Sequence, residues 1–196
     1  MTEIQYTATA RPDTGVTNQK LGMWLFLAFD VMLFGSLFSS YALLRSGATS
    51  WPVQSSIVNV PLASLNTLVL IASSVTILRG VAAMRAGQVG VFRQFMSVTA
   101  ALGILFLVIK SIEYRGALAD GLRPSTSNFL GLYFVMTFVH AVHVACGVLV
   151  NLFLCGPGVA MTRRDAARFT GRVECAAIYW NFIDVIWILM FIVLYA

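Results

Sequence analysis

The chain has 196 residues, of which 59% are hydrophobic and only 11% are charged. Soluble domains carry about 25% charged residues, so too few charges are present to cover a water-soluble globule. The abundant apolar surface also excludes intrinsic disorder. The net charge of +5 comes from basic residues scattered along the chain, and this pattern argues against a nucleic-acid partner. The three cysteines lie in or beside apolar runs without CxxC spacing and are interpreted as small hydrophobic residues.

Five segments are long and apolar enough to cross a membrane, which takes about 20 residues. They are residues 21–44, 61–84, 95–114, 129–154 and 173–196, and a polar tail, residues 1–20, precedes them. The tail lacks the apolar stretch of a cleavable signal peptide. The runs lack the alternation of a β-barrel strand. The sequence therefore predicts an all-α integral membrane protein, folded as one bundle of five transmembrane helices.

The distribution of Lys and Arg predicts the orientation of this bundle. Nine of the 13 lie in the tail and in the second and fourth connections: Arg11, Lys20, Arg79, Arg85, Arg93, Arg163, Arg164, Arg168 and Arg172. The other four are Arg45, Lys110, Arg115 and Arg123. Because cytoplasmic loops are enriched in basic residues, we expect a cytoplasmic N-terminus and a periplasmic C-terminus.

Three ionisable residues fall near the middle of the expected spans. At 1.5 Å per residue, Asp30, His140 and Asp184 lie roughly 14 to 16 Å from an end of their spans, and the hydrocarbon core is about 30 Å thick. An unpaired carboxylate at this depth costs at least about 2.5 kcal/mol. We therefore expect Asp30 to pair with His140 or with His143 on the fourth span.

Two spans carry a polar stripe at helical spacing. The stripe of the fifth span is Glu174, Ala177, Asn181, Asp184 and Ile188, and that of the fourth is Thr137, His140, Val144, Gly147 and Asn151, with His143 at its edge. One interpretation is that both stripes pack inward and hydrogen-bond across the bundle. The other is a protonatable or lipid-contacting cluster.

The two histidines do not by themselves indicate a metal centre. Both lie on one span, no third His exists, and neither Cys nor carboxylate at matching spacing completes a site. A self-contained bis-histidine haem is excluded because its ligands must approach the iron from opposite sides. A single axial His stays open, but the favoured interpretation is that His140 donates to a neighbouring carboxylate or carbonyl. We expect no metal or other cofactor in this chain.

Two further patterns have a structural interpretation. Lys110 and Glu113 are three residues apart and are expected to form a local ion pair that ends a short third helix. Small polar residues in the second span, from Asn66 to Ser74, indicate close helix–helix contact.

The four arginines of the fourth connection, Arg163, Arg164, Arg168 and Arg172, are candidates for binding anionic lipid headgroups.

Five motifs, one in each span and in the same order, resemble subunit III of the haem–copper oxidases, the cytochrome c oxidase subunit III family. They are the first span with its mid-span acid at Asp30, PLASLNT at 61–67, KSIEY at 110–114, TFVHAVHV at 137–144 and ECAAIYWNFIDVIW at 174–187. Two positions depart from the family pattern. Phe138 replaces a usual Gly, which questions close packing there, and Asn181 replaces a usual His, which weakens a proton-relay role for that stripe.

The resemblance implies a non-catalytic accessory subunit of a respiratory terminal oxidase, which reduces O2 and translocates protons. Such subunits hold no haem or copper themselves. They stabilise the catalytic subunit I that holds both groups, bind phospholipid and support proton uptake. Subunit II, a small fourth subunit and a respiratory supercomplex are further candidate partners. The electron donor, cytochrome c or a quinol, is selected in other subunits, and the expected location is the bacterial inner membrane.

Three alternatives stay open. The departures at Phe138 and Asn181 would suit a divergent subunit III-like protein associated with nitric oxide reductase. A small proton-coupled transporter would use the same buried acids, but it normally shows an inverted repeat, and none is visible here. A haem-bearing membrane anchor would need a His donated by a partner.

Overall fold

The computed structural model describes residues 6, 9–52 and 58–195. Its five long helices are α1 (Asn18–Gly47), α2 (Val60–Arg85), α3 (Val89–Ala119), α4 (Asn128–Cys155) and α5 (Ala166–Tyr195), and a short 3-10 helix, η2 (Pro157–Arg163), links the last two. All five are long and apolar enough to cross a membrane. The described residues contain no strand, so the all-α, five-span expectation is confirmed. Residues 1–5, 7–8 and 196, which fall in the expected tail and fifth span, lie outside the described residues.

The helices extend beyond the apolar segments that predicted them. The third helix starts at Val89 and ends at Ala119, so the expectation that Lys110 and Glu113 end a short helix is wrong. The fifth starts at Ala166, seven residues before the expected position. Backbone hydrogen bonds continue the helix past the last apolar turn, whereas hydropathy locates only the part that suits hydrocarbon.

Side-chain caps and one glycine turn define several helix ends. The side chains of Thr17, Asn59 and Ser127 accept hydrogen bonds from backbone N–H groups in the first turns of α1, α2 and α4. These bonds satisfy amides that have no partner within the helix. Between α2 and α3 the chain reverses within a few residues, and Gly87 adopts a φ of +73° there, a conformation that glycine adopts readily.

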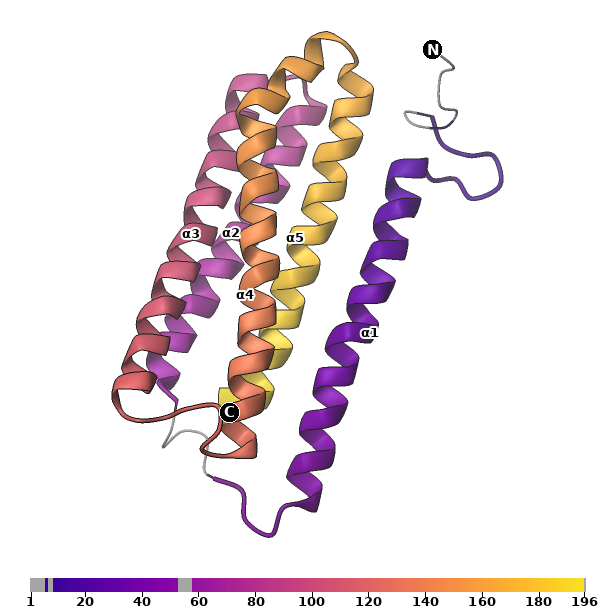
Figure 1. Cartoon of the computed structure of the whole chain (residues 1–196). Coiled ribbons are helices and arrows are strands. Elements are labelled where there is room, and N and C mark those ends of the chain that lie inside the picture. The colour runs from indigo at the N-terminus through magenta and orange to yellow at the C-terminus, as the bar shows by residue number, and fades with distance from the viewer. Residues whose placement is uncertain (1–5, 7–8, 53–57, 196) are drawn as a thin grey trace.

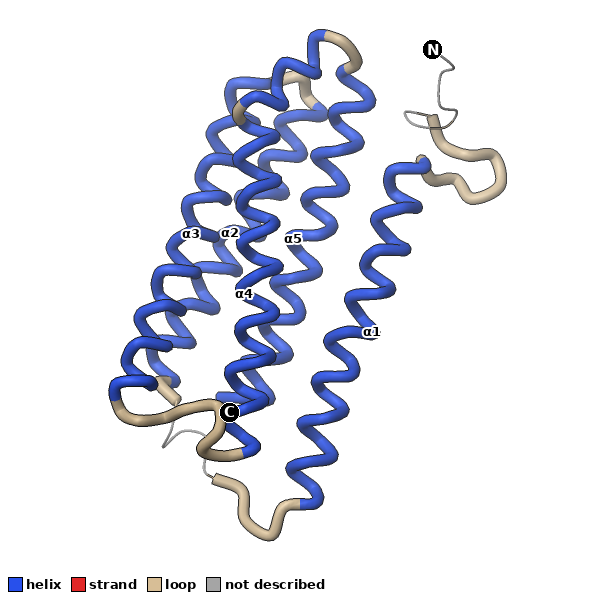
Figure 2. The backbone as a smooth tube through the Cα atoms, viewed as in Figure 1, coloured by secondary structure: helices blue, strands red, loops and turns tan. Residues whose placement is uncertain are grey.

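Helices α2 to α5 form a closed ring, and α1 lies outside it (Figure 1). Around the ring α2 packs on α3, α3 on α4, α4 on α5 and α5 on α2, whereas α1 packs on α4 and α5. Successive helices run in opposite directions, so the connections gather at two ends (Figure 2). We call these the N-terminal end, where α1 begins, and the C-terminal end, where α5 finishes. Their sidedness in the membrane stays a prediction.

Trp180 fills the middle of the ring, where two glycines leave room for its indole. A Cβ at Gly103 on α3 or at Gly147 on α4 would lie 2.7 or 2.8 Å from the ring of Trp180. The indole Nε1 donates to Ser73 Oγ on α2 at 2.9 Å. Trp180 thus joins all four ring helices, and its surroundings show why small residues are needed at these depths.

Candidate functional site: buried polar clusters

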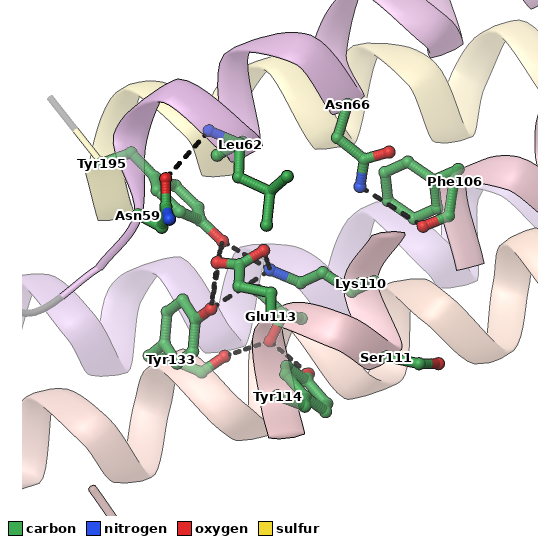
Figure 3. Close-up of polar contacts among 12 residues, drawn as sticks. Asn59, Leu62, Asn66, Phe106, Lys110, Ser111, Glu113, Tyr114, Tyr133 and Tyr195 are labelled. Atoms are coloured by element: carbon green, nitrogen blue, oxygen red, sulfur yellow. Dashed lines mark hydrogen bonds and ion pairs between the residues drawn. The ribbon is translucent and has the colours of Figure 1, made fainter. Parts of the chain in front are cut away.

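The most connected polar cluster lies near the C-terminal end and joins three helices (Figure 3). Lys110 Nζ on α3 donates to Glu113 Oε2 at 3.0 Å, to Tyr133 Oη on α4 at 3.2 Å and to Tyr195 Oη on α5 at 2.5 Å. Both tyrosine hydroxyls also donate to Glu113 Oε1, at 2.6 and 2.8 Å. We call these four residues the Lys110 cluster.

Aromatic rings complete the surroundings of the buried ammonium group. The centroids of Tyr114, Tyr133, Trp187 and Tyr195 lie 5.0 to 5.5 Å from Lys110 Nζ, close enough for cation–π attraction. Side-chain exposure of Lys110 is only 2%, so this charge depends on protein groups instead of water. The cluster is net neutral, and its hydroxyls and carboxylate oxygens all have partners.

The sequence predicted one bond of this cluster and missed the rest. The Lys110–Glu113 pair is present as expected, but its setting is a buried junction instead of a helix end. Tyr133 lies four residues before Thr137, so it continues the polar stripe of the fourth span. That periodicity could have suggested Tyr133 as a member. The contribution of Tyr195 depends on which helices pack together, and one sequence does not specify this.

Asp30 lies against the second of the two histidines. Its Oδ1 is 3.4 Å from His143 Nε2, and His143 Nδ1 lies 2.8 Å from the backbone oxygen of Val139. This contact connects α1 to α4 and matches one of the two pairings expected from depth. The second oxygen, Asp30 Oδ2, is buried and has no hydrogen-bond partner among residues 6, 9–52 and 58–195.

His140 makes no hydrogen bond to any described residue, so the expectation that it donates to a carboxylate or carbonyl is wrong. Both of its ring nitrogens lack a partner in this part of the chain, and the side chain is fully buried. Its neighbours are the rings of Phe106 and Trp187, with centroids 5.6 and 5.1 Å away. The reason is geometric: α1 packs beside His143, whereas His140, three residues earlier, points into the aromatic interior of the ring.

The stripe of the fifth span lies along α2. Near the N-terminal end, Glu174 binds Lys20 and Arg85, each at 2.7 Å, and it is therefore paired. Deeper in the helix, Ser74 Oγ donates to Asp184 Oδ2, while Asp184 Oδ1 is buried and has no hydrogen-bond partner within the described part of the chain. Asn181 donates to the backbone oxygen of Ala177 at 2.7 Å.

The stripe of the fourth span packs inward, as one of the two interpretations proposed. Thr137, His140, Val144, Gly147 and Asn151 are all buried. Thr137 Oγ1 lies 2.5 Å from Tyr114 Oη on α3. Phe138 projects away from these residues and is 60% exposed. Its phenyl group, at the position where the family usually has Gly, therefore does not disturb packing within this chain.

The candidate headgroup arginines gather at the N-terminal end. Arg163 and Arg164 are exposed, and Arg168 and Arg172 are partly buried. Arg172 also lines a groove of about 560 Å³ between α1, α4 and α5. Its walls are mostly apolar and include Met23, Phe26 and Val150. Among the described residues, no group of three or more His, Cys, Asp or Glu could hold a metal ion.

These features define a polytopic membrane bundle in which the carboxylates of Asp30, Glu113 and Asp184 contact side chains of neighbouring helices. Residues 5–196 match the sequence model of the family described as cytochrome c oxidase subunit III. The chain belongs to the cytochrome c oxidase subunit III family. It is accordingly a multi-pass protein of the bacterial plasma membrane and a subunit of a respiratory oxidase complex.

Similar proteins come from several bacterial groups. "Cytochrome c oxidase subunit 3" of Thermostichus vulcanus is 38% identical over 175 residues, covering 89% of this chain and 85% of the relative. "Cytochrome bo(3) ubiquinol oxidase subunit 3" of Pseudomonas aeruginosa is 32% identical over 178 residues, covering 91% and 84%. "Cytochrome c oxidase subunit 3" of Bacillus sp. (strain PS3) is 29% identical over 195 residues, covering 96% and 92%.

Proposed function

We propose that this chain is a non-catalytic accessory subunit that stabilises the catalytic subunit of a haem–copper terminal oxidase, binds phospholipid and supports proton uptake. The observation that carries the proposal is the family match over residues 5–196, which spans all five helices. Haem and copper would belong to the partner subunit. The carboxylates of Asp30, Glu113 and Asp184 each contact a side chain on another helix of this chain, which suits a supporting role.

Co-purification tests the assignment. A tagged chain is expressed in its native host and purified in mild detergent, and the preparation is examined by mass spectrometry and by its haem spectrum. We expect a haem–copper catalytic subunit and subunit II to accompany the chain, and the chain produced alone to show no haem band. Haem bound by the isolated chain, or transport activity of the chain alone in liposomes, would instead favour the anchor or the transporter.

The groove between α1, α4 and α5 supports the phospholipid part of the proposal. Its apolar walls suit acyl chains, and Arg172 at the N-terminal end suits an anionic headgroup. We expect replacement of Arg163, Arg164, Arg168 and Arg172 by Gln to reduce the anionic lipid that co-purifies with the complex. The matched control is Arg115→Gln plus Arg123→Gln at the opposite end. Equal lipid content in the two preparations would contradict headgroup binding by these arginines.

The Asp30–His143 contact supports the proton-uptake part. Intramembrane ionisable pairs are frequent components of proton pathways, and this one joins α1 to the ring at 3.4 Å. We expect Asp30→Asn to slow proton uptake by the assembled oxidase without changing its haem content. The control is Ser36→Ala, at an exposed position of the same helix. If both variants take up protons at the rate of the unmodified complex, the pair has no role in uptake.

A further inference from the structure

A hollow at the C-terminal end of the ring reaches the Lys110 cluster. It has a volume of about 240 Å³ and lies between the beginning of α2, the last turns of α3 and the beginning of α4. Its walls include Asn59, Gly116 and Asp120, together with two members of the cluster, Glu113 and Tyr133. Gly116 and Asp120 are exposed, so the hollow opens at the surface. We call it the α2/α3/α4 hollow.

Within the buried ion pair, Glu113 is the member that has hydrogen-bonding capacity left. A carboxylate can accept about four hydrogen bonds, and Glu113 accepts three from described residues, one each from Lys110, Tyr133 and Tyr195 (Figure 3). The ammonium group of Lys110 uses each of its donors. Among the described residues, Glu113 lines the hollow and Lys110 does not. An occupant of the hollow therefore meets the acceptor of the pair.

The position of Glu113 makes water the expected occupant. The residue lies in the last two turns of α3, which ends at Ala119, roughly 9 Å away at 1.5 Å per residue. Its side chain is 4% exposed, compared with 2% for Lys110. One water takes up about 30 Å³ in the liquid, so several fit. An acyl chain is a poor alternative, because it would cover the free acceptor of Glu113 and the carboxylate of Asp120 without offering a donor.

Gly116 leaves this space open without serving helix packing. A Cβ at Gly116 would meet no atom within 4 Å. At Gly103 and Gly147, in contrast, a Cβ would lie 2.7 or 2.8 Å from the indole of Trp180. The glycines in the middle of the ring thus admit a side chain, whereas Gly116 borders space that no described side chain fills.

The groups around Glu113 form a connected path for protons. Tyr133 lines the same hollow and donates to Glu113 at 2.6 Å. From α2, the residues that line the hollow are not titratable. The titratable side chains that face Glu113 from α3, α4 and α5 or share the hollow with it are Lys110, Tyr114, Asp120, Tyr133 and Tyr195.

We propose that the α2/α3/α4 hollow is a water site through which the Lys110 cluster exchanges protons with solvent at the C-terminal end. A proton passes from one water in the hollow to the Tyr133 oxygen, while the Tyr133 proton passes to Glu113, which returns it to a second water. One O–H bond forms for each that breaks, and the cluster keeps its charge. The inference goes beyond the proposed function, which assigns proton uptake to the contact of Asp30 with His143.

Hydroxyl-radical footprinting tests whether water occupies the hollow. The full chain and its accompanying subunits are purified from the native host, placed in lipid nanodiscs and exposed to a short X-ray pulse, and oxidised side chains are mapped by mass spectrometry. Tyr179 is the comparison, because it is 9% exposed against 2% for Tyr133 but lines the mostly apolar groove between α1, α4 and α5. We expect roughly fivefold more oxidation at Tyr133, since polar sites hold water. Oxidation of Tyr133 no greater than that of Tyr179 would overturn the inference.

Filling the hollow provides a second test. Gly116→Leu and Ala117→Leu each add a side chain at its wall. The matched control is Gly90→Leu, at an exposed glycine near the other end of α3 where a Cβ would also meet no atom within 4 Å. We expect oxidation of Tyr133 to fall roughly tenfold in the two hollow variants, because the added side chain displaces water, and to stay unchanged in the control. Abundance and thermal unfolding establish that all three variants fold.

Deuterium exchange followed by infrared spectroscopy measures the proton step. The carboxylate band of Glu113 is identified by its loss in Glu113→Gln, and its shift in D2O reports replacement of the protons that Glu113 accepts. We expect this shift to be severalfold slower in Gly116→Leu and Ala117→Leu than in Gly90→Leu. Equal rates in the three variants would show that protons reach the cluster by another route and would refute the inference. Neither readout depends on oxidase activity, so a failure of the proposed function is detected separately by co-purification.

Discussion

Helix α1 and the ring of α2 to α5 are held in different ways. In its most hydrophobic 18-residue window, α1 has 17% of its residues buried, whereas the ring helices have 39–50%. Within the ring, Trp180 contacts two glycines and bonds to a third helix, and the Lys110 cluster joins three helices. Helix α1 contacts the ring through Asp30 with His143 and, near its N-terminal end, through Lys20 with Glu174.

The ring is therefore the more buried part of the chain, and polar side chains bond its helices to one another. Helix α1 is the peripheral part. Within the ring, the Lys110 cluster buries two opposite charges that are bonded to each other and to two tyrosines, so loss of one charged member leaves the other stranded. The Asp30–His143 contact is longer, at 3.4 Å, and it joins two side chains, whereas the Lys110 cluster joins four. We therefore expect substitutions in the ring to cost more stability than substitutions at the α1 contact.

The largest effect is expected at the Lys110 cluster. Lys110→Met keeps most of the side-chain volume but strands Glu113, and we expect it to lower the free energy of unfolding by about 3–5 kcal/mol. Denaturation of the chain in detergent micelles, followed by circular dichroism, measures this loss. The double variant Lys110→Met with Glu113→Gln should recover much of it. Equal stability of the single and double variants would show that the buried charge does not govern this junction.

The next effect is expected where Trp180 packs. Gly147→Ala would place a Cβ 2.8 Å from the indole, and we expect such overpacking to cost about 1–3 kcal/mol. Gly116→Ala is the control because a Cβ there would meet no atom within 4 Å. The two variants are compared by thermal unfolding and by tryptophan fluorescence. If Gly147→Ala is as stable as Gly116→Ala, the ring is less tightly packed than its contacts indicate.

A smaller effect is expected at the contact between α1 and the ring. Asp30→Asn should lower the free energy of unfolding by only about 1 kcal/mol, because Asn keeps the shape of the side chain and an oxygen that accepts a hydrogen bond. A double-mutant cycle with His143→Gln measures the coupling between the two side chains. A coupling as large as the loss at Lys110 would remove the distinction drawn between α1 and the ring.

The smallest effect is expected at Phe138. Its side chain is 60% exposed, so Phe138→Ala should change the stability of the isolated chain by no more than about 0.5 kcal/mol. Unfolding in micelles under the same conditions gives the comparison. A large loss would mean that this ring is packed against another part of the chain.

Hydropathy was sufficient for the number and class of helices, because 20 consecutive apolar residues suit few other structures. It placed the helix ends poorly where polar residues extend a helix, as before Val173 and after Tyr114. The similar depths of Asp30 and the two histidines in their spans predicted that Asp30 contacts one of them. Depth could not tell which one, because His140 and His143 are only about one helical turn apart and their surroundings depend on which helix lies alongside.

Composition and spacing alone therefore determined that this protein crosses the membrane five times, and the order of its motifs indicated the family. Tertiary structure alone decided which polar groups meet: Tyr195 with Lys110, His143 with Asp30, and Ser74 with Asp184. The physical reason is that transfer into hydrocarbon is a property of each segment by itself. A hydrogen bond between helices, in contrast, requires their relative rotation and packing to be fixed.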